Sequence, residues 1–135
     1  MARQPLPPIA VVVGFIDCIN RSDLLSLADM MTDDHTLVVL DESPLVGKAA
    51  NVDAWRGYFE SFGEYVIHPR EIVATGDTVA VRGVTTGSHL DLPDDDELQI
   101  SVLWIAGVAR GKVSRWCVAE DTAARRREAG LTNGA

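Results

Sequence analysis

The stretch Glu64–His89 reads EYVIHPREIVATGDTVAVRGVTTGSH and contains two runs rich in β-branched residues, joined by Gly76 and Asp77. A two-residue Gly-Asp connection between such runs is typical of a β-hairpin. Because the loop has two residues, Thr75 is expected to face Thr78, and the other cross-strand pairs follow from that register. We expect this hairpin to organise the sheet around it.

The register divides the side chains of the hairpin between two faces of the sheet. The first face carries Val66, His68, Arg70, Ile72, Val79, Val81, Gly83, Thr85, Gly87 and His89. The second face carries Tyr65, Ile67, Glu71, Val73, Ala80, Arg82, Val84 and Thr86. Neither face is purely polar, so we expect other parts of the protein to cover both of them.

The length and composition indicate one globular domain. The chain has 135 residues, of which 47% are hydrophobic and 24% charged, and such a chain can bury one sizeable core. We expect this domain to span residues 9–131, with flexible tails at residues 1–8 and 132–135.

The charge of the chain argues against nucleic-acid partners. Twelve Lys and Arg against twenty Asp and Glu give a net charge of −8, which repels phosphate backbones. The apolar run Ile9–Ile16 is too short to cross a bilayer. No signal peptide is apparent, and Cys18 and Cys117 lie far apart without a CxxC motif. We therefore expect a cytoplasmic protein with reduced thiols and no membrane partner.

Hydrophobic periodicity and turn residues predict the order of elements. That order is a helix ending near Asn20, a helix after Ser22, a strand at Thr36–Leu40, a helix beginning at Asn51, the central hairpin, strands at Leu98–Ala109 and Lys112–Asp121, and a short helix at Thr122–Gly130. This order predicts an α+β fold in which three N-terminal helices pack on one side of a curved antiparallel sheet. The spacing of the His, Cys and acidic residues predicts no metal site and no cofactor.

The second hairpin turns at Arg110-Gly111. A two-residue turn there would place Ile105 opposite Trp116 and Ser101 opposite Glu120. The other face of the sheet would then hold Val102, Trp104 and Val113 together with Val84 of the first hairpin. Such an apolar surface is not left in water, so we interpret it as a homodimer interface.

Several segments, in this order, resemble one known superfamily. They are FIDCINRSDLLSLADMMTDDHT (residues 15–36), the Gly47-Lys48 pair, AWRGYFESF (residues 54–62), VATGDTVAVRGVTTGSH (residues 73–89) and GKVSRWCVAEDTAARRREAGL (residues 111–131). The chain resembles the SnoaL-like polyketide cyclase branch of the nuclear transport factor two-like superfamily over roughly residues 9–131. The resemblance implies a cone-shaped fold with a deep, mostly apolar central pocket. It also implies a homodimer formed through the outer face of the sheet.

Two enzymatic relatives within this superfamily provide a comparison of residues. The basic carboxylate and the oxyanion-hole tyrosine of ketosteroid isomerases correspond here to Val39 and Phe15, neither of which can transfer a proton. The Asp-Arg-Asp set of limonene epoxide hydrolases corresponds to Gly83, Thr85 and Val118. Both sets are absent, and because the superfamily shares a shape and not a reaction, function must be argued from the site.

The same comparison implies which side chains face the pocket. If Gly83, Thr85 and Val118 face inward, the predicted register places His68, Arg70, Ser101 and Glu120 beside them. His68 is the first catalytic candidate because an imidazole titrates near neutral pH. In SnoaL-like cyclases a carboxylate of the pocket strands serves as the acid/base, which suggests Glu120. A bulge would bring Asp121 inward in its place, so this choice stays open.

Five further residues are candidates for binding a substrate: Trp55, Tyr58, Thr85, Ser101 and Trp116. Aromatic residues at helical spacing are equally typical of a core. The resemblance therefore favours a cofactor-free acid/base enzyme that isomerises, cyclises or hydrolyses a small hydrophobic carbonyl-bearing compound. The alternative is a non-catalytic homodimeric protein that binds a ligand or serves as an accessory subunit.

Overall fold

The computed structural model describes residues 6–131, which form six strands, two long helices and three short ones. The helices are α1 (Pro8–Asn20), α2 (Leu24–Asp29), α3 (Lys48–Ser61), α4 (Asp94–Glu97) and α5 (Ala123–Glu128). The strands are β1 (Met31–Val39), β2 (Leu45–Val46), β3 (Val66–Thr75), β4 (Thr78–Thr86), β5 (Val102–Ala109) and β6 (Lys112–Glu120). Residues 1–5 and 132–135, which make up most of the expected tails, lie outside the described residues.

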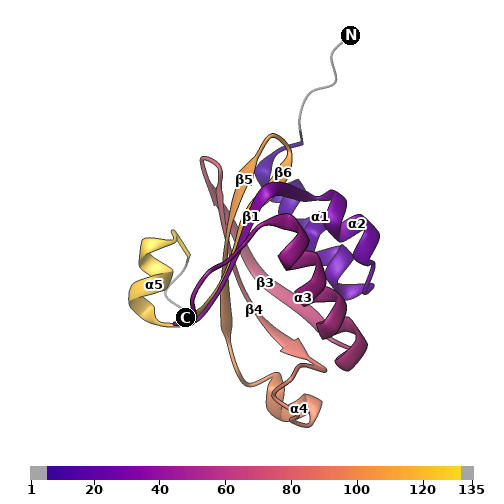
Figure 1. Ribbon diagram of the computed structural model, residues 1–135. Helices are drawn as coiled ribbons and strands as arrows, with labels where there is room; N and C mark the ends of the chain where they lie inside the picture. Colours follow the sequence, from indigo (N-terminus) through magenta and orange to yellow (C-terminus); the bar gives the residue numbers. More distant parts are fainter. Residues whose placement is uncertain (1–5, 132–135) are drawn as a thin grey trace.

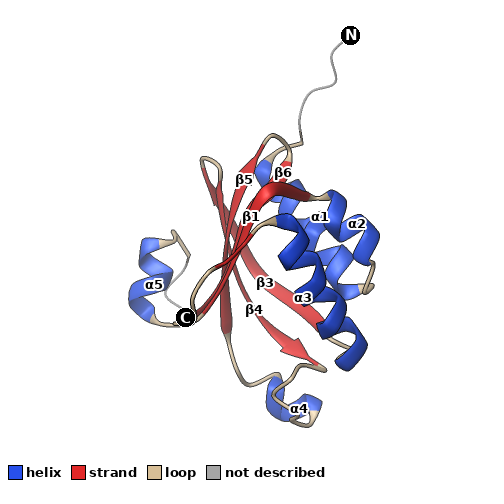
Figure 2. Cartoon of the chain, in the orientation of Figure 1, coloured by secondary structure: helices blue, strands red, loops and turns tan. Residues whose placement is uncertain are grey.

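All six strands belong to one open sheet in the order β2-β1-β6-β5-β4-β3. Strand β1 runs parallel to β6, whereas the other neighbouring pairs are antiparallel. Helices α1, α2 and α3 lie on one face of the sheet, and α5 lies on the opposite face (Figures 1 and 2). The predicted α+β fold class is confirmed. No helix of the described residues is both long and apolar enough to cross a bilayer.

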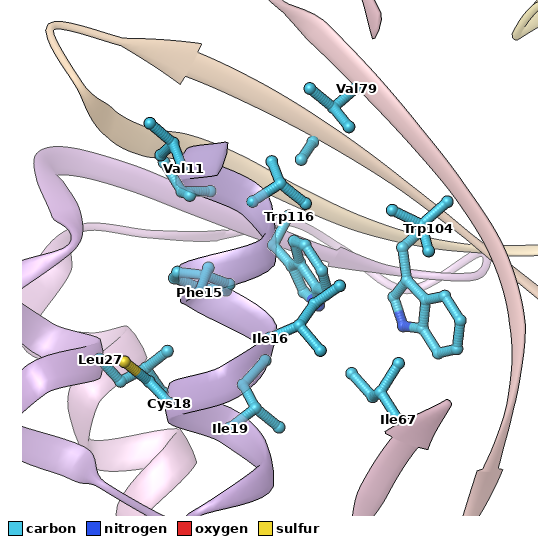
Figure 3. Packing of buried hydrophobic residues seen from close by; sticks show 14 of the residues in the cluster. Val11, Phe15, Ile16, Cys18, Ile19, Leu27, Ile67, Val79, Trp104 and Trp116 are labelled. Atoms are coloured by element: carbon cyan, nitrogen blue, oxygen red, sulfur yellow. The ribbon is translucent and has the colours of Figure 1, made fainter. Parts of the chain in front are cut away.

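The main core lies between α1–α3 and the sheet. Helix α1 begins at Pro8, where the missing N–H of proline costs no helical hydrogen bond. Val12, Phe15 and Ile19 are three or four residues apart and are 0% exposed. The Phe15 ring lies 5.0 Å from the Trp116 ring of β6 (Figure 3). Helix α1 packs against β3, β4, β5 and β6.

The first hairpin follows the predicted register only as far as Glu71, which pairs with Arg82. A β-bulge then shifts the register by one residue, so His68 lies opposite Val84 and not opposite Thr85. Because neighbouring residues point to opposite faces, the shift exchanges the faces for every residue before the bulge. The expectation that His68 faces inward is therefore wrong, and Ile67 occupies the inner face with 1% exposure.

The second hairpin carries a similar bulge between Gly107 and Val108. Trp116 consequently lies opposite Ala106, one residue away from the predicted Ile105. The shift brings Trp104, Val102 and Val113 to the helix-covered face, where Trp104 is 1% exposed. Of the four residues proposed for the homodimer interface, only Val84 remains on the outer face. The homodimer stays a prediction, but that interface assignment was wrong.

The outer face of the sheet has its own small apolar cluster. Ala80 of β4 and Leu103 of β5 are at most 2% exposed and pack with Leu131 and Ala129, which follow α5. Asp121 anchors the start of this segment, because its Oδ1 lies 2.8 Å from Nε of Arg126. The C-terminal segment therefore covers part of the surface that the sequence assigned to a partner subunit.

Candidate functional site

Two adjoining cavities open between α3, the helix-covered face of the sheet and the loop that follows β4. The outer cavity has a volume of about 360 Å³ and the inner one about 190 Å³. Their linings share Val39, Tyr58, Tyr65, His89 and Val118. A further cavity of about 460 Å³ lies on the other face of the sheet beneath α5. We place the candidate site in the adjoining pair, because titratable and apolar side chains converge there.

All five predicted substrate-binding residues line this pair of cavities. Trp55 and Trp116 line the inner cavity, Thr85 and Ser101 the outer one, and Tyr58 both. Their position agrees with the prediction, whereas their role in binding stays a prediction.

Val39 also lines both cavities. The position that corresponds to the base of ketosteroid isomerases therefore faces the pocket, and it carries an aliphatic side chain.

The two predicted catalytic residues do not meet in the cavity. His68 is exposed on the far side of β3, where its Nε2 lies 3.0 Å from Oγ1 of Thr86. Glu120 lines the mouth of the outer cavity at the end of β6, but its side chain is 77% exposed. It pairs across the sheet with Val102 and not with Ser101, so the predicted pairing was wrong, and its side chain does not lie in the predicted apolar surroundings.

His89 takes the place in the cavity that the sequence assigned to His68. It lies in the loop after β4, and its Nδ1 is 2.9 Å from the hydroxyl of Tyr58. The backbone N–H of His89 also donates to that hydroxyl at 3.2 Å. Both contacts fix the loop on α3, and Nε2 of His89 makes no hydrogen bond within the described residues. His89 and Tyr58 thus form an acid/base pair at the cavity wall.

Tyr65 is the second residue that the sequence reasoning missed. It precedes β3 and lines both cavities, with its ring edge-on to the Tyr58 ring at 5.0 Å. The side chain of Asn20 in α1 exchanges hydrogen bonds of 3.0 Å and 2.8 Å with the backbone of Ile67, which holds this edge of the sheet beside the helix. The hydroxyl of Tyr65 has no hydrogen-bond partner among residues 6–131.

Burial raises the pKa of both tyrosines above the ordinary value of 10.0. For Tyr65 the shift is large, and the nearby Tyr58 and Glu97 raise its pKa further. For Tyr58 the hydrogen bond from His89 opposes the rise in pKa that burial causes. Because both phenols stay protonated at neutral pH, each is available as a hydrogen-bond donor.

Glu97 is a buried carboxylate behind the wall of the outer cavity. It ends α4, is 1% exposed, and accepts hydrogen bonds from the hydroxyl of Thr85 and, at 3.4 Å, from the N–H of Ser88. Thr85 and Ser88 both line the cavity. Residues 91–96, which precede Glu97, are exposed, and α4 turns only the side chain of Glu97 inward.

A family model described as a SnoaL-like domain matches residues 12–116 of the chain. The chain belongs to the SnoaL-like domain family. The predicted resemblance is therefore confirmed at the level of the family. No curated protein matches the chain significantly.

Solved structures agree with this SnoaL-like assignment. A proposed polyketide cyclase from Sinorhizobium meliloti is 21% identical, with a TM-score of 0.68, and the match covers 84% of this chain and 94% of that one. An uncharacterised cystatin-fold protein from Novosphingobium aromaticivorans is 16% identical, with a TM-score of 0.71 and coverages of 84% and 97%. TerC, co-crystallised with polyporic acid, is 17% identical, with a TM-score of 0.67 and coverages of 90% and 97%. At these identities the likeness establishes the fold.

The side chains of this SnoaL-like protein define what the cavity can do chemically. Within residues 6–131 no three His, Cys, Asp or Glu side chains gather in a way that could hold a metal ion. His89 can exchange a proton with a bound molecule, and the free hydroxyl of Tyr65 can donate to an oxygen atom of that molecule. Apolar and aromatic groups form the remaining inner wall.

Proposed function

We propose that this SnoaL-like protein binds a small hydrophobic, carbonyl-bearing compound and catalyses proton transfer on it without a cofactor. One observation carries the proposal: His89, Tyr58 and Tyr65 converge on a cavity whose inner wall is otherwise apolar. Pockets of this kind, mostly apolar with a few convergent polar groups, are typical of small-molecule sites. The polyketide cyclase name of one structural neighbour supports this substrate class.

In the proposed reaction, Nε2 of His89 removes a proton from the carbon next to the carbonyl group. The C–H electron pair forms the enolate, whose oxygen receives a hydrogen bond from Tyr65. In the neutral ring the proton is on Nδ1 and is donated to the oxygen of Tyr58, which leaves the lone pair on Nε2 free and holds the imidazole while it becomes imidazolium. The enolate carbon then attacks a second carbonyl of the same molecule, and the imidazolium returns its proton to the alkoxide that results. The substrate is cyclised with no gain or loss of atoms.

The first prediction tests the base. Exchange of α-protons for deuterium in aromatic 1,3-diketones, followed by NMR, measures proton removal without knowledge of the natural substrate. We expect His89→Gln to slow the exchange about 10²- to 10⁴-fold, because a positioned general base contributes that much. Tyr65→Phe is expected to slow it by about 10²-fold through loss of the donor to the enolate oxygen.

His68→Gln is the matched control, because His68 is exposed on the opposite side of β3. We expect its exchange rate to equal that of the wild type. An unchanged rate in His89→Gln, or an equal loss in His68→Gln, would contradict the assignment of the base.

One observation favours the non-catalytic alternative. Val39 occupies the position that carries the basic carboxylate in ketosteroid isomerases, so the cavity wall has no carboxylate base there. If the protein is a binding module, the same diketones will quench the fluorescence of Trp55 and Trp116 while their α-protons exchange no faster than in buffer. That combination of results would replace the enzymatic proposal.

A further inference from the structure

We infer that the cavity selects uncharged ligands over anionic ones and that Glu97 is the residue that determines this specificity. The inference rests on the adjoining cavities being a ligand site, as in the proposed function, but it does not depend on the reaction. It names the substrate class more narrowly: a carbonyl compound such as an ester, ketone or amide, and not a free acid.

The first step is the state of Glu97 itself. Its carboxylate is 1% exposed and accepts hydrogen bonds only from uncharged donors, the hydroxyl of Thr85 and the N–H of Ser88. Within residues 6–131 no Arg or Lys lies within ion-pair distance of it. A buried charge without a counter-charge acts over several ångströms, because little water screens it.

The second step is the closeness of this charge to the cavity. Both residues that donate to Glu97 line the outer cavity, so a single layer of side chains separates the carboxylate from a bound ligand. Its charge also helps raise the pKa of Tyr58 and Tyr65, which line both cavities. An anionic ligand in the same space is subject to the same repulsion.

The third step is the absence of a compensating cation. Arg125 is the one Arg or Lys among the described residues that line the two cavities. Its Nη1 donates to the backbone oxygen of Glu120 at 3.3 Å and lies 4.0 Å from the carboxylate of the same residue. Asp41 adds a further carboxylate at the mouth. A ligand carboxylate therefore meets negative groups at the mouth and behind the wall.

The second prediction compares two ligands with the same ring system, a methyl ester and the corresponding carboxylate, which differ by the charge and one methyl group. Binding of methyl 2-naphthoate and of 2-naphthoate is measured through the tryptophan fluorescence of the full chain. We expect the wild type to bind the ester at least tenfold more tightly than the acid. Glu97→Gln keeps the shape and the acceptor oxygen but removes the charge, and it is expected to reduce this ratio about tenfold.

Two further variants separate charge from packing. Asp95→Asn removes an exposed charge from the same short helix and is expected to leave the ratio unchanged. Thr85→Val removes a hydrogen bond that stabilises the ionised carboxylate of Glu97, so it is expected to lower the ratio as well. This variant keeps the inference testable if Glu97→Gln fails to fold.

The outcomes are distinct. Equal affinities of the wild type for ester and acid, or a ratio that Glu97→Gln leaves unchanged, overturn the inference alone. Loss of the ratio in Asp95→Asn, or an unchanged ratio in Thr85→Val, overturns it too. Binding of neither ligand overturns the pocket itself and the proposed function with it. Loss of proton exchange in His89→Gln does not bear on it.

Discussion

His35 in β1 is a buried imidazole whose ionisation bears on stability. It is 0% exposed, and its Nδ1 lies 2.7 Å from the carbonyl oxygen of Val113, so the neutral ring donates there. Burial lowers the pKa of His35 below the ordinary value of 6.5, although the Val113 carbonyl and Asp34 partly oppose this shift. The folded protein therefore binds a proton at His35 less readily than the unfolded chain does.

The third prediction follows from this lowered pKa. At pH 8 neither state is protonated at His35, and stability is unaffected. Below an unfolded pKa of about 6.5 the unfolded chain takes up a proton that the fold resists, so stability falls with pH until the folded pKa is reached. We expect urea unfolding between pH 7.5 and pH 5 to show a steeper loss in the wild type than in His35→Gln. The difference in slope is at most about 1.4 kcal/mol per pH unit.

His68→Gln again serves as the control, because His68 is exposed, and its pH slope should match that of the wild type. Parallel slopes for the wild type and His35→Gln would contradict the prediction.

Two glycines explain why the predicted registers of the two hairpins were wrong, and the first of them explains why His68 was placed on the wrong face. A Cβ on Gly83 would lie 2.4 Å from the backbone oxygen of His68, and a Cβ on Gly107 would lie 3.1 Å from Oγ of Ser114. Each glycine thus allows the close approach that a bulge requires, and Pro69 cannot donate to the ladder at the first bulge. The sequence contained these signals. A bulge predicted at Gly83 would have placed His68 on the outer face of the sheet and Tyr65 on the inner face.

At the scale of elements, Asn51 joins three segments at the start of α3. It is 0% exposed, and its Nδ2 lies 3.0 Å, 3.0 Å and 2.9 Å from the carbonyl oxygens of His35, Leu45 and Gly47. These contacts connect α3 to β1 and to the residues around β2. The sequence assigned Asn51 to the N-cap, but the helix begins three residues earlier at Lys48, and the side chain points into the protein.

The fourth prediction is that Asn51→Ala destabilises the fold by about 2–4 kcal/mol. The substitution removes the hydrogen bonds of a buried amide, each of which contributes about 0.5–1.5 kcal/mol, although the carbonyl oxygens of His35 and Gly47 keep the backbone N–H donors of Gly47 and of residue 51. Urea unfolding measures the change. Asp53→Asn, on the exposed face of the same helix, should change the free energy of unfolding by less than about 0.5 kcal/mol. Similar effects of the two substitutions would show that the Asn51 contacts contribute little.

Most helices and strands could be predicted from the sequence, and the two shortest, β2 and α4, could not. Helix α1 and both hairpins have clear periodicity and turn residues. Strand β2 has two residues and α4 has four, all acidic, so neither carries a periodic pattern. This limit affected the prediction of the site most, because α4 supplies Glu97 and the loop before it supplies His89.

At the scale of the whole molecule, the order of elements was sufficient to identify the family, because the fold is a property of many weak patterns together. The pocket depends on a few side chains whose direction a single bulge reverses.

The net charge of −8 is likewise a property of the whole chain, and it produces a negative potential around the molecule. This potential and the local charge of Glu97 both disfavour anionic ligands. Their contributions can be distinguished by adding salt, which screens the potential more strongly than the buried charge.

The fifth prediction uses this difference. The Debye length falls from about 30 Å at 0.01 M salt to about 3 Å at 1 M, so salt screens the surface charges but not a buried carboxylate. We expect the ester-to-acid affinity ratio of the wild type to decrease with salt and then to level off well above one. In Glu97→Gln the ratio at 1 M sodium chloride should level off about tenfold lower than in the wild type, because the buried charge is gone and only the desolvation of the ligand carboxylate and the methyl group of the ester remain. Equal ratios in the two proteins at 1 M would assign none of the selectivity to Glu97.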